Sequence, residues 1–406
     1  MDSLITAAAR ALAAGDPLAA LNWIALREDA SALALRGIAM AQLGDLVVAK
    51  ALVRRAARSF GQREPIARAR CVVAEAEIAL VSRELGWPAK ALDAARVTLE
   101  EHGDRVNAAY ARYLEARRLL LIGRLDEAER SLGELDVSLF QPAAKATYEL
   151  VVAGISIRRL RTKAARDALA RAGSAARAAA IPALITEVEN ASRVLNTPAA
   201  RLIADGEERL LLLEQVEALH ASKAIVVDAC RCLVRDSVTL VSLARRPVLF
   251  ALARALAEAW PGDVAREVLL ARAFGAKFTD DSHRARLRVE ISRLRAVLMR
   301  LADVRATKRG FAMTPRRARD IVVLAQPVEE QHGAVLAMLS DGDAWSSSAL
   351  ALALGGNQRT IQRALETLAA TGRVQFFGKG RARRWTTPPV PGFTTTLLLP
   401  TSLQIG

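Results

Sequence analysis

Apolar residues recur every three or four positions through the first half of the chain, and this spacing predicts amphipathic helices. One such stretch carries Leu33, Leu35, Ile38, Met40 and Leu43. Strand-like runs are almost absent up to about residue 220. We therefore expect residues 1–220 to form an α-helical domain.

A glycine, four intervening residues and an alanine recur within this region. Copies begin at Gly15, Gly44, Gly86 and Gly123, at intervals of 29, 42 and 37 residues. Such a glycine ends one helix in a tight turn, and the small alanine lets the next helix approach closely. The pattern resembles the tetratricopeptide repeat, although the Trp and Tyr positions of that family are mostly missing.

Two questions about this domain stay open at the sequence level. Another kind of α-helical bundle is the alternative to a tetratricopeptide-like array. An array of this kind commonly binds a peptide, a protein partner or a second protomer, and the alternative is a helical spacer without a ligand.

The spacing changes after residue 220, where short runs rich in Val, Ile and Leu predict strands at 225–228, 231–234 and 238–241. A helix is expected next, because Pro247 suits the first turn of a helix. Its inward stripe consists of Leu249, Leu252 and Leu256.

Two further helices and a strand pair complete this region. One helix is expected over 263–274, and the next follows Thr279-Asp280-Asp281, whose side chains can cap it. A strand pair within 304–313 would place Lys308-Arg309-Gly310 at its tip. The inward stripe of the third helix consists of Leu287, Ile291, Leu294 and Leu298.

The order of strands, three helices and a hairpin over 221–315 resembles the OmpR/PhoB-type winged-helix DNA-binding domain. Residues 287–298 are similar to the recognition helix of that family, including its Ile-x-x-Leu-Arg core, and residues 307–311 are similar to its wing, one residue shorter. Phe274-Gly275 stands where the family usually has Trp-Gly. The resemblance implies that the third helix lies in the major groove of DNA.

The outward face of this third helix is rich in arginine, which can bond the O6 and N7 atoms of guanine bidentately. Glu290 is the acidic residue among them. For any one of these arginines, a solvated helix face is the alternative. The predicted DNA contacts of this domain are Arg284, Arg286, Arg288, Ser292, Arg293, Arg295, Lys308 and Arg309.

A second winged-helix domain is predicted over 328–388. Helices at 329–339 and 349–354 and a third capped by Asn357 precede a hairpin around residues 378–381. The stretch 354–365 looks like the turn and recognition helix of a bacterial regulator. A module used for protein contact or dimerisation is the alternative. The predicted DNA contacts are Gln358, Arg359, Thr360, Gln362, Arg363, Lys379, Arg381 and Arg383.

The apolar residues 389–406 form a tail that would add a strand to a neighbouring sheet or remain a frayed end.

Charge divides the chain unevenly. Of the net charge of +15, residues 1–220 contribute +2 and residues 221–406 contribute +13. A neutral half joined to a basic half favours a polyanionic partner for the second half.

The rarer residues argue against several other classes of protein. Three cysteines and four histidines exclude a disulfide scaffold and argue against a zinc cluster. Cys230 and Cys232 form only a C-x-C pair, and His283 has no partner at ligand spacing. We find no P-loop, nucleophile elbow, His-Glu-x-x-His motif, signal peptide or apolar run of 18 residues. We therefore expect no enzyme activity, cofactor, metal or membrane segment.

Together these features predict a mainly α-helical bacterial transcription regulator, cytoplasmic and associated with the nucleoid. Its tetratricopeptide-like domain would sense a signal, bind a partner or dimerise, and two winged-helix domains would bind specific double-stranded DNA. One alternative is a sequence-independent DNA-binding protein of replication, repair or chromosome organisation. The other is a protein-interaction adaptor.

Overall fold

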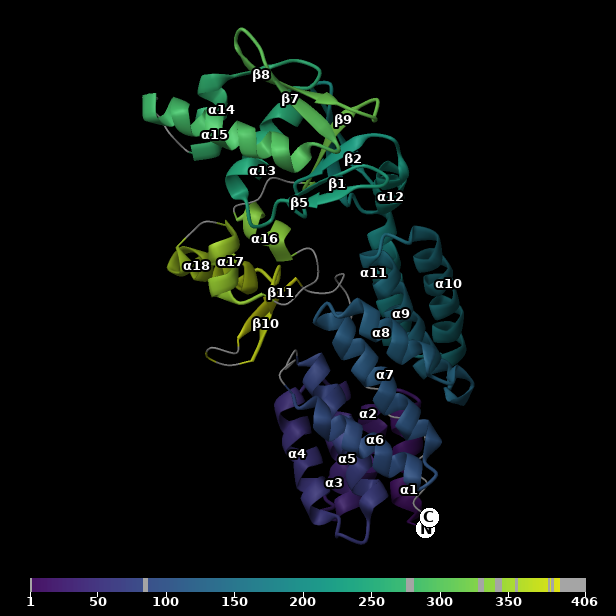
Figure 1. The fold of residues 1–406 in the computed structure, drawn as a ribbon. Coiled ribbons are helices and arrows are strands. Elements are labelled where there is room, and N and C mark those ends of the chain that lie inside the picture. Colours follow the sequence, from purple (N-terminus) through teal and green to yellow (C-terminus); the bar gives the residue numbers. More distant parts are fainter. Residues whose placement is uncertain are drawn as a thin grey trace. The chain divides into compact units, whose positions relative to one another are not determined.

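The computed structural model describes residues 2–82, 87–274, 281–327, 332–339, 345–354, 357–378, 380 and 383–387 (Figure 1). These residues are mainly helical. They divide into two compact units, with the boundary between Val194 and Leu195. None of the helices in the described ranges has the length and apolarity that crossing a membrane requires.

The first unit is a series of helices joined by short turns. Each helix packs against the next, and α1, α3, α5, α7, α9 and α11 also contact one another in that order. The bounds are α1 Ser3–Ala13, α2 Pro17–Ile24, α3 Ala30–Gln42, α4 Leu46–Ser59, α5 Pro65–Val81, α6 Ala89–Glu101, α7 Arg105–Leu121, α8 Leu125–Gly133, η1 Val137–Leu139, α9 Pro142–Arg158, α10 Thr162–Ala179 and α11 Pro182–Arg193, followed by η2 Val194–Asn196.

The predicted turn glycines adopt the left-handed conformation that ends a helix. Gly15, Gly44 and Gly123 have φ values of 76°, 90° and 83°. The alanines five positions later, Ala20, Ala49 and Ala128, are fully buried. Gly86 lies outside the described residues, and its alanine, Ala91, is half-buried on α6.

A further turn of the same geometry has no glycine. Leu160, between α9 and α10, has a φ of 54°. Its amide and the next one donate to carbonyls three and five positions earlier, as they do at Gly123. Ala165 follows five positions later and is fully buried. The repeated turn therefore also occurs between α9 and α10, where a leucine replaces the glycine that marks the other copies.

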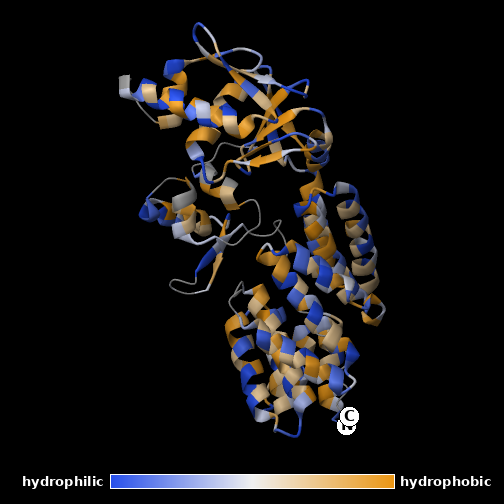
Figure 2. Cartoon of the chain, viewed as in Figure 1, coloured by the Kyte–Doolittle hydropathy of each residue, from blue (hydrophilic) through white to orange (hydrophobic). Residues whose placement is uncertain are grey.

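Apolar and polar positions alternate along each of these helices (Figure 2). The buried side chains of these helices are mostly apolar. Tyr110 and Tyr113 on α7 lie at the centre, each with its ring centroid 6.4 Å from that of Phe140. The Tyr110 hydroxyl donates to the buried carboxylate of Glu77 at 2.7 Å.

The second unit opens with a hairpin that the sequence pattern did not lead us to expect. Strands β1 (Ala200–Ala204) and β2 (Glu207–Leu211) precede α12 (Leu213–Ala221). The expectation of helix up to residue 220 is therefore wrong for residues 200–211. Asp205 and Gly206 have φ values of 52° and 80°, which is the backbone of a two-residue hairpin turn.

The hairpin belongs to a six-stranded sheet with the order β2-β1-β9-β3-β4-β5. The three predicted strands are β3 (Ile225–Asp228), β4 (Leu233–Arg235) and β5 (Leu240–Ser242). Between β1 and β3 lies β9 (Ile321–Ala325), antiparallel to β1, parallel to β3 and wholly buried. The sheet therefore joins segments that are about a hundred residues apart.

Three helices and a second sheet lie between β5 and β9. The helices are α13 (Pro247–Glu258), α14 (Arg266–Phe274) and α15 (Asp281–Leu298), and the predicted inward stripes of α13 and α15 are buried. The expectation of a helix from residue 263 is wrong for its first residues, because residues 264–265 form a strand. The sheet has the order β6-β8-β7, from β6 (Val264–Ala265), β7 (Ala302–Ala306) and β8 (Gly310–Pro315).

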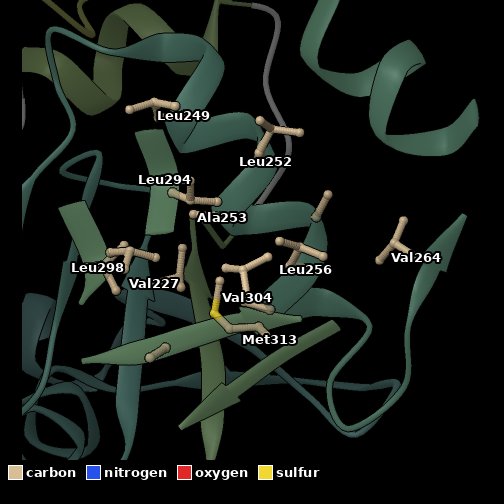
Figure 3. Close-up of a cluster of buried hydrophobic side chains, with 14 of the residues drawn as sticks. Val227, Leu249, Leu252, Ala253, Leu256, Val264, Leu294, Leu298, Val304 and Met313 are labelled. Atoms are coloured by element: carbon tan, nitrogen blue, oxygen red, sulfur yellow. The ribbon is translucent and has the colours of Figure 1, made fainter. Parts of the chain in front are cut away.

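One hydrophobic core serves both sheets and these helices (Figure 3). Leu252 and Leu256 of α13 meet Leu294 of α15 there, and Val304 and Met313 enter from the β7–β8 hairpin. The core therefore fixes the orientation of α15 and of the hairpin together.

The last described segment has a core of its own around Trp385, which is 1% exposed. Asn357 caps α18 as predicted, because its Oδ1 accepts the Arg359 amide at 2.8 Å. The tail 389–406 lies outside the described residues. The elements are α16 (Gly333–Leu339), α17 (Ser347–Leu354), α18 (Gln358–Ala370), β10 (Gln375–Phe377) and β11 (Arg384–Thr386).

Candidate nucleic-acid interface

The side chains predicted to contact DNA from α15 lie on its solvent face. They are exposed, whereas the stripe from Leu287 to Leu298 is buried in the core below them. The helix thus presents a basic surface on a rigid support. The exposed set is Arg284, Arg286, Arg288, Ser292, Arg293 and Arg295.

Neighbouring groups hold several of these arginines. Arg293 pairs with Glu290 at 2.8 Å, and the Arg286 guanidinium lies 4.5 Å from the centroid of the Phe274 ring. Arg295 Nε donates to the Val304 carbonyl at 2.7 Å and so connects α15 to β7. Within the described ranges, Arg288 has no ion pair or hydrogen bond from its side chain, so its guanidinium is available to a ligand.

The tip of the β7–β8 hairpin presents Lys308 and Arg309 to solvent. Arg309 is 76% exposed on its side chain and lies 3.9 Å from Asp263. Thr307 Oγ1 donates to Asp263 Oδ2 at 2.6 Å and accepts the Gly310 amide at 2.9 Å. Asp263 thereby fixes the turn that carries both cations.

A second support comes from the start of α14. The Arg266 guanidinium donates to the carbonyls of Thr307 and Lys308, both at 3.3 Å, and lies 5.5 Å from the Phe311 ring centroid. The sequence analysis did not identify Asp263 and Arg266. Their contacts are with a turn about 40 residues later in the chain, and local sequence patterns do not reveal such contacts.

The hairpin also carries a basic residue that we did not predict. Arg305 is exposed on β7, between the buried Val304 and the tip. Successive residues of a strand point to opposite faces, so a buried Val304 predicts that Arg305 points to solvent.

The predicted contacts on α18 are exposed as well. Gln358 Nε2 lies 3.4 Å from Ser347 Oγ, and Gln362 lies 3.3 Å from Glu366. Thr360 also borders a cavity next to α13. Ile361, Ala364, Leu365 and Leu368 are buried on the opposite face. The exposed set is Gln358, Arg359, Thr360, Gln362 and Arg363.

The second hairpin is described only in part. Lys379 and Arg381 lie outside the described residues. Arg383 is half-buried, with its guanidinium 4.6 Å from the Phe376 ring centroid and 5.8 Å from that of Trp385. The structure therefore places Arg383 on aromatic rings, where it packs against the hairpin.

A cluster of titratable groups lies at the turn after β3. Asp228 is buried and accepts the amides of Cys230 and Arg231 at 2.8 and 3.0 Å. His220 Nε2 is 4.0 Å from Asp228 Oδ2. Burial lowers the pKa of His220 to about 4, with Arg235 and Arg231 adding to the effect.

The thiols in this cluster are poor nucleophiles. Burial raises the pKa of Cys230 to about 12 and that of Cys232 to about 11, so both remain protonated near neutral pH. Over the described parts of the chain, no group of three or more His, Cys, Asp and Glu side chains is placed to hold a metal ion.

No protein-family model, curated protein or solved structure matches the chain.

Proposed function

We propose that the second unit binds double-stranded DNA and that the protein is a sequence-specific regulator of transcription. The observation that carries this proposal is the exposed basic face of α15 beside the supported tip of the β7–β8 hairpin. Phosphates attract such a surface, and the arginines on it have the hydrogen-bonding geometry to read guanine.

The arrangement of elements supports a winged-helix interpretation of this part of the chain. A helix, a short strand, two helices and a hairpin follow one another, and β6 pairs with the hairpin strand β8. In the proposal, α15 enters the major groove, and Lys308 and Arg309 contact the backbone next to it. Asp263 and Arg266 act as positioning residues for the tip.

We propose the segment from α16 to β11 as a second DNA-binding module. The exposed polar residues of α18 have the chemistry to read bases, since Gln pairs with adenine and Arg with guanine. Two modules in one chain could bind two half-sites, so dimerisation is not required for bipartite recognition.

For the first unit we propose a tetratricopeptide-like array that receives a signal, a protein partner or a second protomer. The repeated turn geometry at Gly15, Gly44, Gly123 and Leu160, and the ordered contacts among the odd-numbered helices, support this proposal. A cytoplasmic, nucleoid-associated location in a bacterium follows from the same proposal.

The decisive experiment is selection of bound sites from a random duplex DNA library at physiological salt. One enriched motif, above all a bipartite one, is the expected result. Binding without enrichment would instead support a sequence-independent DNA-binding protein. Absence of binding even at low salt would contradict both and favour an adaptor.

Site-directed variants test the interface on α15. We expect Arg288→Ala and Arg293→Ala each to weaken binding to the selected site by about 1–3 kcal/mol, because each removes a contact to a base edge. The measurement is fluorescence anisotropy of labelled DNA. Arg58→Ala, an equal charge change on α4 of the first unit, is the control and should leave affinity unchanged. Wild-type affinity in both α15 variants would remove this helix from the interface.

A further inference from the structure

Helix α2 of the first unit turns large apolar side chains toward solvent. On its inner side, Ala20 and Ile24 are fully buried in a core shared with α1 and α3. On its outer side, Leu18 and Trp23 are 63% and 50% exposed, and Leu26 in the turn that follows is 97% exposed. A helix that is apolar on all sides is normally buried, so this outer side is typical of a surface that a partner covers.

One polar side chain lies among these apolar ones. Ala25 keeps a helical backbone, with φ of −57° and ψ of −36°, so Leu18, Asn22 and Leu26 form one row at a spacing of four residues. Asn22 is exposed, and within the described ranges its side chain forms no hydrogen bond. A primary amide carries both donors and an acceptor, so it can pair with another amide of the same kind. We call Leu18, Asn22, Trp23 and Leu26 the α2 face.

Charge is absent from the α2 face and balanced at its edge. No charged residue occurs between Asp16 and Arg27. The Arg27 guanidinium pairs with Asp2 and, at 2.7 Å, with Asp29. Such a surface neither attracts a polyanion nor repels a copy of itself. An apolar centre with a polar edge is also the usual composition of a protein–protein interface.

We propose that the α2 face binds the α2 face of a second copy of this chain about a two-fold axis. A two-fold contact places the same residues opposite each other, so Asn22 meets Asn22 and each amide donates to the oxygen of the other. Leu18, Trp23 and Leu26 of both copies pack around this pair. A partner of another sequence would have to provide a matching amide at one point, whereas symmetry provides it in a second copy. An asparagine pair within an apolar contact also fixes its register.

The size of the α2 face sets the expected affinity. It presents roughly 500 Å² per copy, so the contact buries roughly 1,000 Å² in total, which is at the lower end for a specific interface. We therefore expect a reversible dimer with a dissociation constant on the order of 1–10 µM. This inference deepens the proposal that the first unit receives a second protomer, and it does not depend on DNA binding.

Sedimentation velocity of the full chain at a series of concentrations tests the contact. We expect an equilibrium between monomer and dimer. Leu26→Glu should weaken the dimer about tenfold or more, because two carboxylates enter an apolar contact. Val238→Glu adds the same charge at an apolar residue of the second unit that is 88% exposed, and as the matched control it should dimerise like the wild type. A wild-type chain that stays monomeric, or unchanged dimerisation of Leu26→Glu, would overturn the proposal.

Opposite charges at Asn22 test the two-fold arrangement itself. Asn22→Asp and Asn22→Lys should each be monomeric, because like charges would meet across the axis. An equimolar mixture of the two variants should form a heterodimer, since opposite charges then meet. Circular dichroism verifies that both variants are folded. A mixture of folded variants that remains monomeric would overturn the two-fold contact.

DNA binding measured on the same samples separates this inference from the proposed function. Dimers that depend on the α2 face, in a protein that binds no DNA, would refute the proposed regulator and support the contact. A chain that binds DNA but remains monomeric at every concentration would support the proposed regulator and refute the contact.

Discussion

Single residues of the second unit show how a solvent-exposed turn is given a fixed shape. The side chains of Asp263, which precedes β6, and Arg266, the first residue of α14, reach the β7–β8 tip. They hydrogen-bond Thr307 Oγ1 and the carbonyls of Thr307 and Lys308. No single one of these hydrogen bonds would orient both cations toward solvent. Together these interactions hold Lys308 and Arg309 on a turn of fixed shape. In the proposed complex with DNA, such a turn would reduce the entropy lost when the two cations contact phosphates.

Gly310 is required there because of space rather than backbone conformation. A Cβ atom at this position would lie 1.8 Å from the Val264 carbonyl oxygen, within the β6–β8 pair. We expect Gly310→Ala to separate these strands and to lower the free energy of unfolding by about 2–3 kcal/mol. Urea unfolding measures the loss. Gly133→Ala is the control, since nothing lies within 4 Å of a Cβ there. Equal stability of the two variants would show that β6 does not approach β8 so closely.

His220 gives the second unit an acid-sensitive group. The unfolded imidazole has a pKa near 6.5, whereas burial lowers the folded pKa to about 4. Between these two pKa values the unfolded chain binds the proton and the folded chain does not. The contribution of His220 to the free energy of unfolding is therefore fully present above pH 6.5 and is lost as the pH decreases toward 4. From pH 7 to pH 5 the loss attributable to this group is about 2 kcal/mol.

Comparison of urea unfolding at pH 7 and pH 5 tests this assignment. His220→Gln should reduce the stability difference between the two pH values, because it removes the titrating group. Burial raises the pKa of the neighbouring Asp228, which acts in the opposite direction and is present in both proteins. His102→Gln, which removes an exposed imidazole, should leave the difference in place. An unchanged difference in His220→Gln would contradict the assignment.

At the scale of elements, helix ends were the most predictable features and strand partners the least. Pro247 and Asn357 begin helices where local chemistry favours a start, and the glycine turns follow from the need for positive φ. The exposed faces of α15 and α18 follow from helical periodicity in the same way. The place of β9 between β1 and β3 could not be predicted, because nothing local specifies a partner about a hundred residues away. By contrast, the Asp205-Gly206 pair is typical of two-residue hairpin turns, so this hairpin could have been predicted from the sequence.

The end of α10 provides a test of these turn rules. Ala180 caps the helix in the left-handed region with a φ of 56°, and its side chain is exposed. We expect Ala180→Gly to stabilise the first unit by about 1 kcal/mol, because glycine adopts this conformation without strain and no packing is lost. Thermal unfolding provides the measurement. Ala178→Gly, in the same helix at an exposed position, should destabilise by a similar amount. Destabilisation by both substitutions would argue against a left-handed cap.

At the scale of the whole molecule, the positive charge is concentrated in the second half of the chain, as the proposed DNA-binding function requires. The excess of positive charge after residue 220 accompanies the elements with exposed arginine faces. Affinity for a polyanion through such a surface arises largely from release of counterions and therefore falls with salt. The nearly neutral first half is suited to contacts that do not depend on a polyanion.

The salt dependence of DNA binding tests this division. We expect Lys308→Ala to reduce the slope of log affinity against log salt by about one, because one phosphate contact is lost. Anisotropy titrations between 50 and 200 mM salt, roughly the range over which such slopes are resolved, provide the slopes. Arg58→Ala should leave the slope unchanged, since this cation lies on α4. The same reduction in both variants would mean that net charge, and not the hairpin tip, sets the slope.

The central position of β9 also determines the order in which the second unit can be completed during synthesis. β1 and β3 leave the ribosome long before their shared neighbour, since roughly 90 residues separate the end of β3 from the start of β9. At about 5–20 residues per second, this interval lasts roughly 5–20 s. Throughout it the nascent chain exposes two unpaired apolar strand edges, which are sites of aggregation. Expression yield should therefore depend on cellular chaperones that cover such edges until Ile321 emerges.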